Sequence, residues 1–382
     1  MRYIFIVQGE GRGHLTQALS MYETLTRNGN EVAEILIGKN ELLSLPAFFR
    51  KKVQCPVTIF NSPCFLFSSK NKKSMLGKSI FYNVKKSPDY VKSIRFIKRR
   101  IEENDADLVV NFYEMLTGLT YAFTRPKTPY ICVAHQYLFF HPDFVFPKKS
   151  ILQLAGLLFF TRLTCFRAFK LLALSFREMR NVDNIRVVPP LIRNEVLHQT
   201  PSEGNYILGY MLNAGFSEQV LDWHDKNKDV PLYFFWDKKN VAKETQIDET
   251  LIFHQLEDVN FLNRMAGCKA YASTGGFESI CEALYLQKPV MMIPAHIEQE
   301  CNAFDAMNVG AGIASAEFNL SSLLEFLPSY QPNTAFASWV HKGIFIFLRE
   351  LRLEEKQGNW FSVMELIFLK NFWQKYKLKM QG

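Results

Sequence analysis

The stretch STGGFESICEALYLQKPVMMIPAHIEQECNA, residues 273–303, combines a glycine turn with a helical pattern and a second apolar segment. Gly275 and Gly276 follow the apolar segment 268–272 and precede apolar residues at helical spacing. Glycine lets a backbone approach a ligand closely, and the free N–H groups at the positive end of a helix favour an anion. The stretch therefore predicts a strand, a tight turn and a helix start that together hold a phosphate group.

Polar residues after the turn extend this predicted site. Ser279 adds a hydroxyl beside the helix start, and Glu282 lies further along the helix, where a carboxylate can accept both hydroxyls of a ribose. The segment 288–294, KPVMMIP, is typical of a short buried parallel strand. Glu298 and Gln299 follow its carboxyl end, where open α/β sheets bind ligands. Each residue alone has a plain structural alternative, but their shared order favours a site for a nucleotide sugar.

In this order and spacing, the stretch resembles the donor-binding signature of glycosyltransferases with the two-domain GT-B fold. It is similar to inverting enzymes that use nucleotide-diphosphate sugars, namely those related to the peptidoglycan lipid-intermediate N-acetylglucosaminyltransferase and to the glucuronosyltransferases. Many glucuronosyltransferase-type enzymes have histidine where this chain has Thr274, so no imidazole is expected at the phosphate. The resemblance assigns the diphosphate to Gly275, Gly276 and Ser279, the start of the phosphate-facing helix to Phe277, the ribose to Glu282, and the donor sugar to Glu298, Gln299 and Asn302.

The amino terminus repeats the order of strand, glycine turn and helix. The apolar segment RYIFIV, residues 2–7, is followed by QGEGRGHLTQALSMYETL, residues 8–25. Gly9, Gly11 and Gly13 have the spacing G-x-G-x-G, which disfavours a dinucleotide-binding G-x-G-x-x-G loop. The segment resembles the first loop of the same glycosyltransferases.

His14 stands at the predicted helix start, where the positive end of the dipole keeps an imidazole neutral and able to act as a base. In the glucuronosyltransferase-type enzymes the histidine of this loop is the general base, so the resemblance implies that role for His14. Binding of the acceptor or of a phosphate stays open as the alternative. Arg12 is either a phosphate contact or a solvated loop cation, and Glu10 is a candidate on the acceptor side.

Two further polar positions follow strand-like segments of the first half. Glu114 comes after ADLVVNFY, and His135, with Gln136, comes after PYICVA. Both positions are expected at the carboxyl edge of the first sheet, where they would bind the acceptor or assist His14. The alternative for each is a loop residue with its hydrogen bonds satisfied.

Length and composition predict two α/β domains. Apolar strand-like segments alternate with helical patterns along the chain, which favours parallel sheets covered by helices. The 382 residues exceed one ordinary core, and 48% of them are hydrophobic. We expect an acceptor-binding domain at 1–185, a donor-binding domain at 186–350, and a helical tail at 351–382 that crosses back to the first domain. IRVVPPL is placed in the second series of strands, with a linker near 183–193.

Seven separate cysteines and no C-x-x-C pair indicate a reducing compartment, and the amino terminus is expected to be a core strand and no signal peptide. We therefore expect a cytoplasmic protein.

Positive charge and phenylalanine concentrate in the first half and favour a membrane surface. Residues 70–100 hold eleven basic side chains against Asp89, an excess of ten that exceeds the net charge of +8 of the whole chain. No nucleic-acid reader motif accompanies it, so anionic lipid or a lipid-linked phosphate fits better, with a mobile solvated loop as the alternative. Residues 144–176 are too often interrupted by charge for a membrane span. They predict a helix at the membrane interface, with a buried helix or a dimer contact as alternatives. Five of their cations project within about 140° on a helical wheel, at 3.6 residues per turn: Lys148, Lys149, Arg162, Arg167 and Lys170.

These features together predict an inverting, metal-independent glycosyltransferase, peripheral on the inner face of the cell membrane. Its donor is expected to be a UDP-sugar, its acceptor a hydroxyl on a lipid or lipid-linked glycan, and no cofactor beyond the nucleotide-sugar co-substrate is expected. No D-x-D-like motif stands in a convincing position. The alternatives are a nucleotide-sugar epimerase or hydrolase of the same fold, or a protein that binds nucleotide sugars without turnover.

Overall fold

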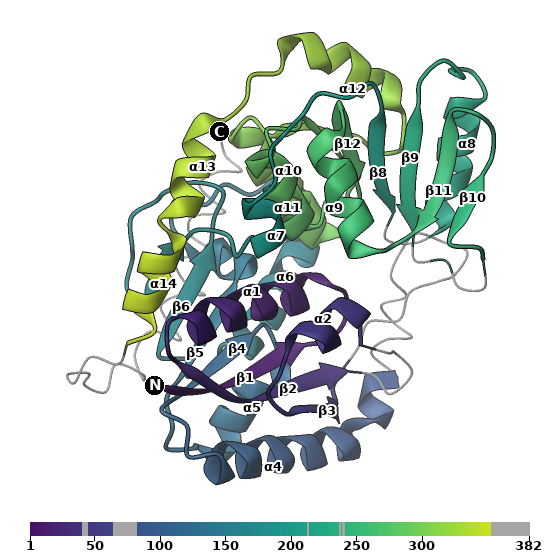
Figure 1. Cartoon of the computed structure of the whole chain (residues 1–382). Helices are drawn as coiled ribbons and strands as arrows, with labels where there is room; N and C mark the ends of the chain where they lie inside the picture. The colour runs from purple at the N-terminus through teal and green to yellow at the C-terminus, as the bar shows by residue number, and fades with distance from the viewer. Residues whose placement is uncertain (40–44, 64–81, 212–213, 237, 239–240, 353–382) are drawn as a thin grey trace.

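The computed structural model describes residues 1–39, 45–63, 82–211, 214–236, 238 and 241–352. Within these ranges the chain forms two seven-stranded sheets covered by helices, as the sequence predicts (Figure 1). The strands are apolar and most are buried on both faces, which is typical of parallel sheets between helical layers.

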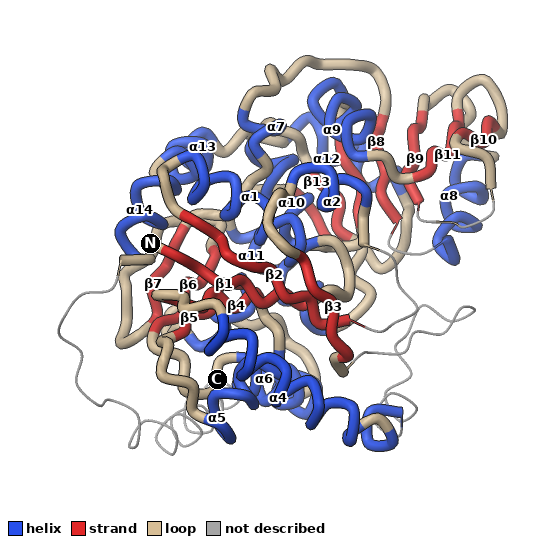
Figure 2. The backbone as a smooth tube through the Cα atoms, turned by 60° about the horizontal axis from the view of Figure 1, so that its bottom comes forward, coloured by secondary structure: helices blue, strands red, loops and turns tan. Residues whose placement is uncertain are grey.

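The first sheet has the order β3-β2-β1-β4-β5-β6-β7, and all of its neighbouring strands are parallel. Its strands are β1 (Arg2–Gln8), β2 (Glu31–Lys39), β3 (Val57–Asn61), β4 (Leu108–Phe112), β5 (Tyr130–Ala134), β6 (Lys170–Leu174) and β7 (Ile185–Val188). Its helices are α1 (Gly13–Arg27), α2 (Ala47–Lys52), α4 (Ser87–Glu103), α5 (Met115–Thr124), η1 (His135–Phe140) and α6 (Ile151–Thr164). Figure 2 shows α4, α5 and α6 together on one side of this sheet.

The second sheet has the order β10-β11-β9-β8-β12-β13-β14 and is parallel except for β10. Its strands are β8 (Ile207–Met211), β9 (Leu232–Trp236), β10 (Glu244–Gln246), β11 (Leu251–Gln255), β12 (Ala270–Ser273), β13 (Val290–Met292) and β14 (Gly312–Ala314). The helices from its side of the chain are α7 (Asn194–Leu197), η2 (Ala214–Phe216), α8 (Ser217–His224), α9 (Asp258–Gly267), α10 (Phe277–Tyr285), α11 (Ile297–Asn308), α12 (Leu320–Phe326), η3 (Leu327–Ser329), α13 (Thr334–His341) and α14 (Gly343–Glu350).

Two details differ from the sequence expectation. The segment IRVV, placed in the second series of strands, is β7 and pairs with β6 in the first sheet, so the predicted boundary at residue 186 falls inside a strand. The return to the first domain is made by α13 and α14, where Trp339 Nε1 donates to the carbonyl of Ser175 at 3.0 Å and Lys170 pairs with Glu350 at 3.0 Å. The predicted tail lies outside the described residues beyond Arg352.

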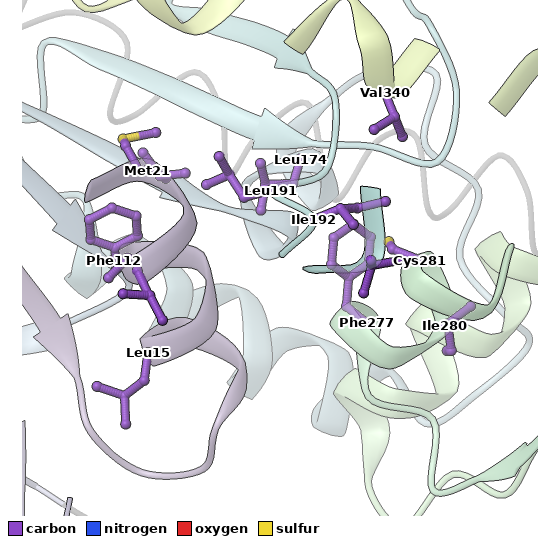
Figure 3. Close-up of a cluster of buried hydrophobic side chains, with 14 of the residues drawn as sticks. Leu15, Met21, Phe112, Leu174, Leu191, Ile192, Phe277, Ile280, Cys281 and Val340 are labelled. Atoms are coloured by element: carbon purple, nitrogen blue, oxygen red, sulfur yellow. The ribbon is translucent and has the colours of Figure 1, made fainter. Parts of the chain in front are cut away.

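One apolar cluster joins the two sheets. It includes Leu15 and Phe112 of the first sheet layer and Phe277 and Ile280 of α10, with Leu191 between them (Figure 3). Buried apolar area contributes about 25 cal/mol per Å², so this shared core stabilises one arrangement of the two sheets. The elements that follow β1 and β12 are thereby held against each other.

Candidate active site

The two glycine turns predicted from the sequence meet at one place. Helix α1 begins at Gly13 and α10 begins at Phe277, and the two helices pack together. A Cβ atom on Gly13 would collide with the carboxylate of Glu278, so a larger residue at this position would force that carboxylate to move. The predicted first loop and the predicted donor segment therefore lie against each other where the two domains meet.

His14 lies in this contact. Its Nδ1 is 3.3 Å from Oε1 of Gln17, and its ring stacks on Tyr113 with centroids 5.2 Å apart. Burial lowers the pKa of His14 below 6.5, while the negative charge of Glu298 acts in the opposite direction. Tyr113 has a φ of 62°, a left-handed conformation that is costly for a bulky residue and is found at functional sites.

The predicted sugar-binding residues lie at the start of α11. Glu298 accepts a hydrogen bond at 2.7 Å from Nε2 of Gln136, which comes from the other domain. Gln299 instead uses its Oε1 to accept from the backbone of Ala295 at 2.8 Å. Asn302 is buried and its Nδ2 donates to the carbonyl of Gly275 at 3.4 Å. Glu298 is thus the member of this group that faces the first domain.

The predicted ribose acid is paired in this structure. Glu282 is buried on α10, and Arg193 grips it through Nε at 2.5 Å and Nη2 at 2.7 Å. Each carboxylate oxygen has two lone pairs, so this bidentate contact leaves acceptor capacity on both oxygens. The pairing is compatible with a ribose contact, and it also gives Glu282 a structural role that the sequence did not show.

The glycine turn itself has the expected form. Gly275 has a φ of 63°, and Gly276 is the residue before α10, with no side-chain cap at the helix start. Ser279 Oγ donates to the carbonyl of Gly276 at 3.3 Å. The side chain of Phe277 stacks on His135 with centroids 4.1 Å apart, so it packs between the domains and leaves only its backbone to serve a phosphate.

The other predicted residues of the first domain are held in structural contacts. Glu114 is buried, caps α5 by accepting from the backbone of Leu116 and accepts from Ser62 at 2.6 Å; burial raises its pKa to about 7. His135 is buried and its Nδ1 donates to the carbonyl of Leu174 at 2.7 Å. Burial also lowers the pKa of His135, and the charge of Asp305 opposes this. These hydrogen bonds of Glu114 and His135 go to groups other than His14.

The remaining loop residues surround this site. The Gly9 N–H donates to the carbonyl of Gly38 at 2.7 Å, which fixes the start of the loop. Gly11 has a φ of 79° with open space beside it. Arg12 places its guanidinium over the ring of Phe48 at 5.6 Å, and the negative charge of Glu10 raises the pKa of Glu114 further.

Sequence reasoning missed Gln17, Tyr113, Arg193 and Glu278. Glu278 is polar and stands in the first turn of α10, inside the decisive stretch, which was the available signal. The contacts of the other three bridge distant segments, and sequence spacing does not reveal them. Among the described residues, no three His, Cys, Asp or Glu side chains gather into a possible metal site.

Comparison with known proteins agrees with this geometry. The family model described as glycosyl transferase family 1 matches residues 1–330. No curated protein sequence matches the chain.

Similar solved structures include the glycotransferase of kitacinnamycin (14% identity, TM-score 0.61, covering 92% of this chain and 99% of that chain). They also include the spinosyn forosaminyltransferase SpnP (14% identity, TM-score 0.59, covering 92% of this chain and 99% of that chain). A third is Phytolacca americana UGT2, solved with UDP-2-fluoro-glucose and pterostilbene (13% identity, TM-score 0.58, covering 90% of this chain and 93% of that chain). The shared fold is that of GT-B enzymes. This chain therefore belongs to glycosyl transferase family 1 and is a glycosyltransferase with the GT-B fold.

Proposed function

We propose that the chain is an inverting, metal-independent glycosyltransferase that moves a sugar from a nucleotide-diphosphate donor, with UDP as the nucleotide, to a hydroxyl acceptor. One observation carries this proposal. His14, at the start of α1, lies against the donor segment, within the electrostatic reach of Glu298 and linked through Gln17 to Glu278. This position supports His14 as the proposed base, beside the residues that would hold the donor sugar.

The chemistry follows from this placement. The acceptor O–H gives its proton to His14 as the oxygen attacks the anomeric carbon, and the bond from that carbon to the diphosphate breaks with its electron pair. The leaving diphosphate gains negative charge beside Gly276, where the free N–H groups of α10 stabilise it. Because burial lowers the pKa of His14, its ring is neutral near pH 7 and ready to accept a proton. A single displacement inverts the anomeric centre.

The proposal is tested with purified protein, a panel of UDP-sugars, UDP binding by calorimetry, and a lipid extract as acceptor. His14→Asn is expected to lower turnover by about 10²- to 10⁴-fold and to leave UDP binding intact. Glu298→Ala is expected to raise the KM for the donor sugar. His198→Asn is the matched control, because His198 is exposed and contacts the backbone of Asn194.

Three outcomes would overturn this function. They are failure to bind any nucleotide diphosphate, near-normal turnover of His14→Asn, or a product whose anomeric centre is retained. Conversion of the UDP-sugar without an acceptor would instead identify an epimerase or a hydrolase. UDP binding without any turnover would identify a binding protein.

We further propose that the acceptor is carried on lipid and that α6 faces the lipid surface. Leu152 and Phe159, seven residues apart on one face of α6, are 82% and 67% exposed. Phe160 on the same helix packs edge-on against Tyr113, which stacks on His14. Helix α6 thus reaches from the proposed base to an exposed apolar face. Among the described residues, none of the helices is long and apolar enough to span a membrane.

Charge supports this surface less than the sequence suggested. Helix α6 ends at Thr164, so Arg167 lies beyond it, and Lys170 is a buried residue of β6 paired with Glu350. The prediction that five cations project from one face of a single helix is therefore wrong. On α4 most cations are paired with acids, including Lys92, Lys98, Arg99 and Arg100. Residues 70–81 of the basic segment lie outside the described residues. The exposed apolar face of α6 therefore carries the proposal.

Vesicle co-sedimentation tests the lipid surface. Wild-type protein is expected to bind vesicles of phosphatidylglycerol and phosphatidylcholine, and the double variant Leu152→Asn/Phe159→Asn is expected to stay in the supernatant. Val259→Asn is the control, because Val259 is a 62% exposed apolar residue on α9 of the second domain. Equal sedimentation of the double variant and wild type would exclude α6 as the lipid contact.

A further inference from the structure

A chain of polar contacts runs from His14 across the domain contact. Gln17, on α1, is buried and has its Oε1 3.3 Å from Nδ1 of His14. Its Nε2 donates a hydrogen bond to Oε1 of Glu278, on α10. Glu278 is 261 positions away from Gln17 in the sequence, so this series of polar contacts exists only when the two domains are docked. The other oxygen of the same carboxylate lies beside Gly13, at the place that a Cβ atom on Gly13 would occupy.

The chemistry of these groups fixes the direction of every hydrogen bond. An ionised carboxylate only accepts, so Gln17 must turn its NH₂ group toward Glu278. The amide oxygen of Gln17 then faces His14 and accepts, so Nδ1 of His14 carries the ring hydrogen. The lone pair is left on Nε2, which takes no part in the contact with Gln17. A protonated Glu278 would relax this constraint, since it could donate to a reversed amide.

We infer that Gln17 and Glu278 are positioning residues that hold His14 in the Nδ1–H tautomer, so that its Nε2 is the proton acceptor only when the two domains are docked. This inference rests on the proposed role of His14 as the base. Glu278 acts through Gln17 and the imidazole, and it touches no reacting atom. These contacts also make the ability of His14 to accept a proton depend on domain docking, because α1 and α10 belong to different domains.

The surroundings of Glu278 add a pH dependence. Burial, followed by the charges of Glu298 on α11 and Glu282 on α10, raises the pKa of Glu278 to about 7, against the lowering effect of Gln17. The neutral thiol of Cys281 also lies within its electrostatic reach. Protonation of Glu278 below about pH 7 removes the constraint that holds His14 in the Nδ1–H tautomer. Because the pKa of His14 is itself lowered, its own protonation occurs at lower pH.

The tautomer can be measured without any turnover. Histidine labelled with ¹⁵N reports its tautomer through the shifts of the two ring nitrogens, and His14→Asn identifies the signal of His14 among the eight histidines of the chain. Wild-type protein at pH 8 is expected to show the Nδ1–H form. Glu278→Gln, whose amide can donate or accept, and Gln17→Met are expected to show a mixture or the Nε2–H form.

A swapped pair is the decisive control. In Gln17→Glu/Glu278→Gln, the new carboxylate at position 17 accepts both from Nδ1–H of His14 and from the amide at position 278. The double variant is therefore expected to regain the Nδ1–H form. In transfer assays, Glu278→Gln is expected to lower kcat by about 10- to 100-fold with the donor KM within about twofold. The onset of the fall in kcat/KM is expected to move from about pH 7 to the lower pH at which His14 itself is protonated. The swap is expected to recover most of kcat.

The inference is overturned if wild-type His14 is in the Nε2–H form, or if both single variants keep the wild-type tautomer. It is also overturned if the swap is no better than Glu278→Gln. A raised donor KM at unchanged kcat in Glu278→Gln would make Glu278 a donor contact instead. Loss of transfer activity in wild type, with the tautomer pattern intact, would reject only the proposed function.

Discussion

The ion pair between Arg193 and Glu282 is expected to be a main determinant of stability in the second domain. The side chains are 10% and 2% exposed, and both oxygens of the carboxylate are bonded, at 2.5 and 2.7 Å. Removal of one partner from such a pair leaves a buried charge unpaired and costs about 3–5 kcal/mol. Arg193→Met should therefore lower the unfolding free energy by that amount. With about 2–4 °C per kcal/mol for a domain of this size, the melting temperature should fall by roughly 6–20 °C.

The double variant separates pairing from packing. Arg193→Met/Glu282→Leu removes both charges and fills the site with apolar atoms, so it should be more stable than Arg193→Met alone. Differential scanning calorimetry and urea titration at pH 7.5 measure all three proteins. Arg180→Met is the exposed control, since Arg180 pairs with Asp143 on the surface, and its melting temperature should equal that of wild type. The reasoning fails if Arg193→Met melts within 2 °C of wild type, or if the double variant is less stable than Arg193→Met.

Three further changes test other parts of the structure. Burial raises the pKa of Glu114 from 4.5 to about 7, so the folded state holds an extra proton between these values and stability falls as the pH rises through them. At 1.36 kcal/mol per pKa unit, this loss of unfolding free energy is about 3 kcal/mol. Glu114→Gln should reduce it in urea titrations from pH 5 to 8.5. If the unfolding free energy of Glu114→Gln falls with pH as steeply as that of wild type, the reasoning is wrong. Gly156→Ala on α6 meets no atom within 4 Å and should raise the unfolding free energy by about 0.5–1 kcal/mol, whereas a loss would indicate an unseen contact. Gly13→Ala forces a methyl group against Glu278 and should lower turnover as Glu278→Gln does, with a stability loss of about 1–3 kcal/mol; normal turnover would contradict the close approach.

The fold was predictable because its information is local. Each parallel strand is a short apolar segment closed by a turn, and β1 and β13 were both found in this way. β10 and β14 were missed because each has only three residues, and β10, with the sequence ETQ, is polar as well. β7 was assigned to the wrong sheet because the two prolines after it looked like a linker, although its register with β6 continues the first sheet.

The site was predictable only as far as it is contiguous in sequence. The glycine turn, Glu282 and Glu298 come from one segment, so their spacing could be read from the sequence, and their roles in binding the donor stay predictions. Arg193 is 89 positions from Glu282, and Gln17 is 261 positions from Glu278, so no spacing could show these pairs. For Glu114 the sequence left open an acceptor-side group or a loop residue with its hydrogen bonds satisfied, and in the structure Glu114 caps α5.

The carboxylate of Glu278 offsets an electrostatic repulsion between the two docked domains. Helices α1 and α10 both direct their amino-terminal ends into the same contact, and two positive dipole ends repel each other. The carboxylate of Glu278 stands in the first turn of α10 and against Gly13, the first residue of α1, so one negative charge serves both ends. A neutral amide at this position keeps the shape but loses that charge. Glu278→Gln should therefore weaken docking as well as release His14, whereas the swapped pair returns the charge to α1 and should restore both.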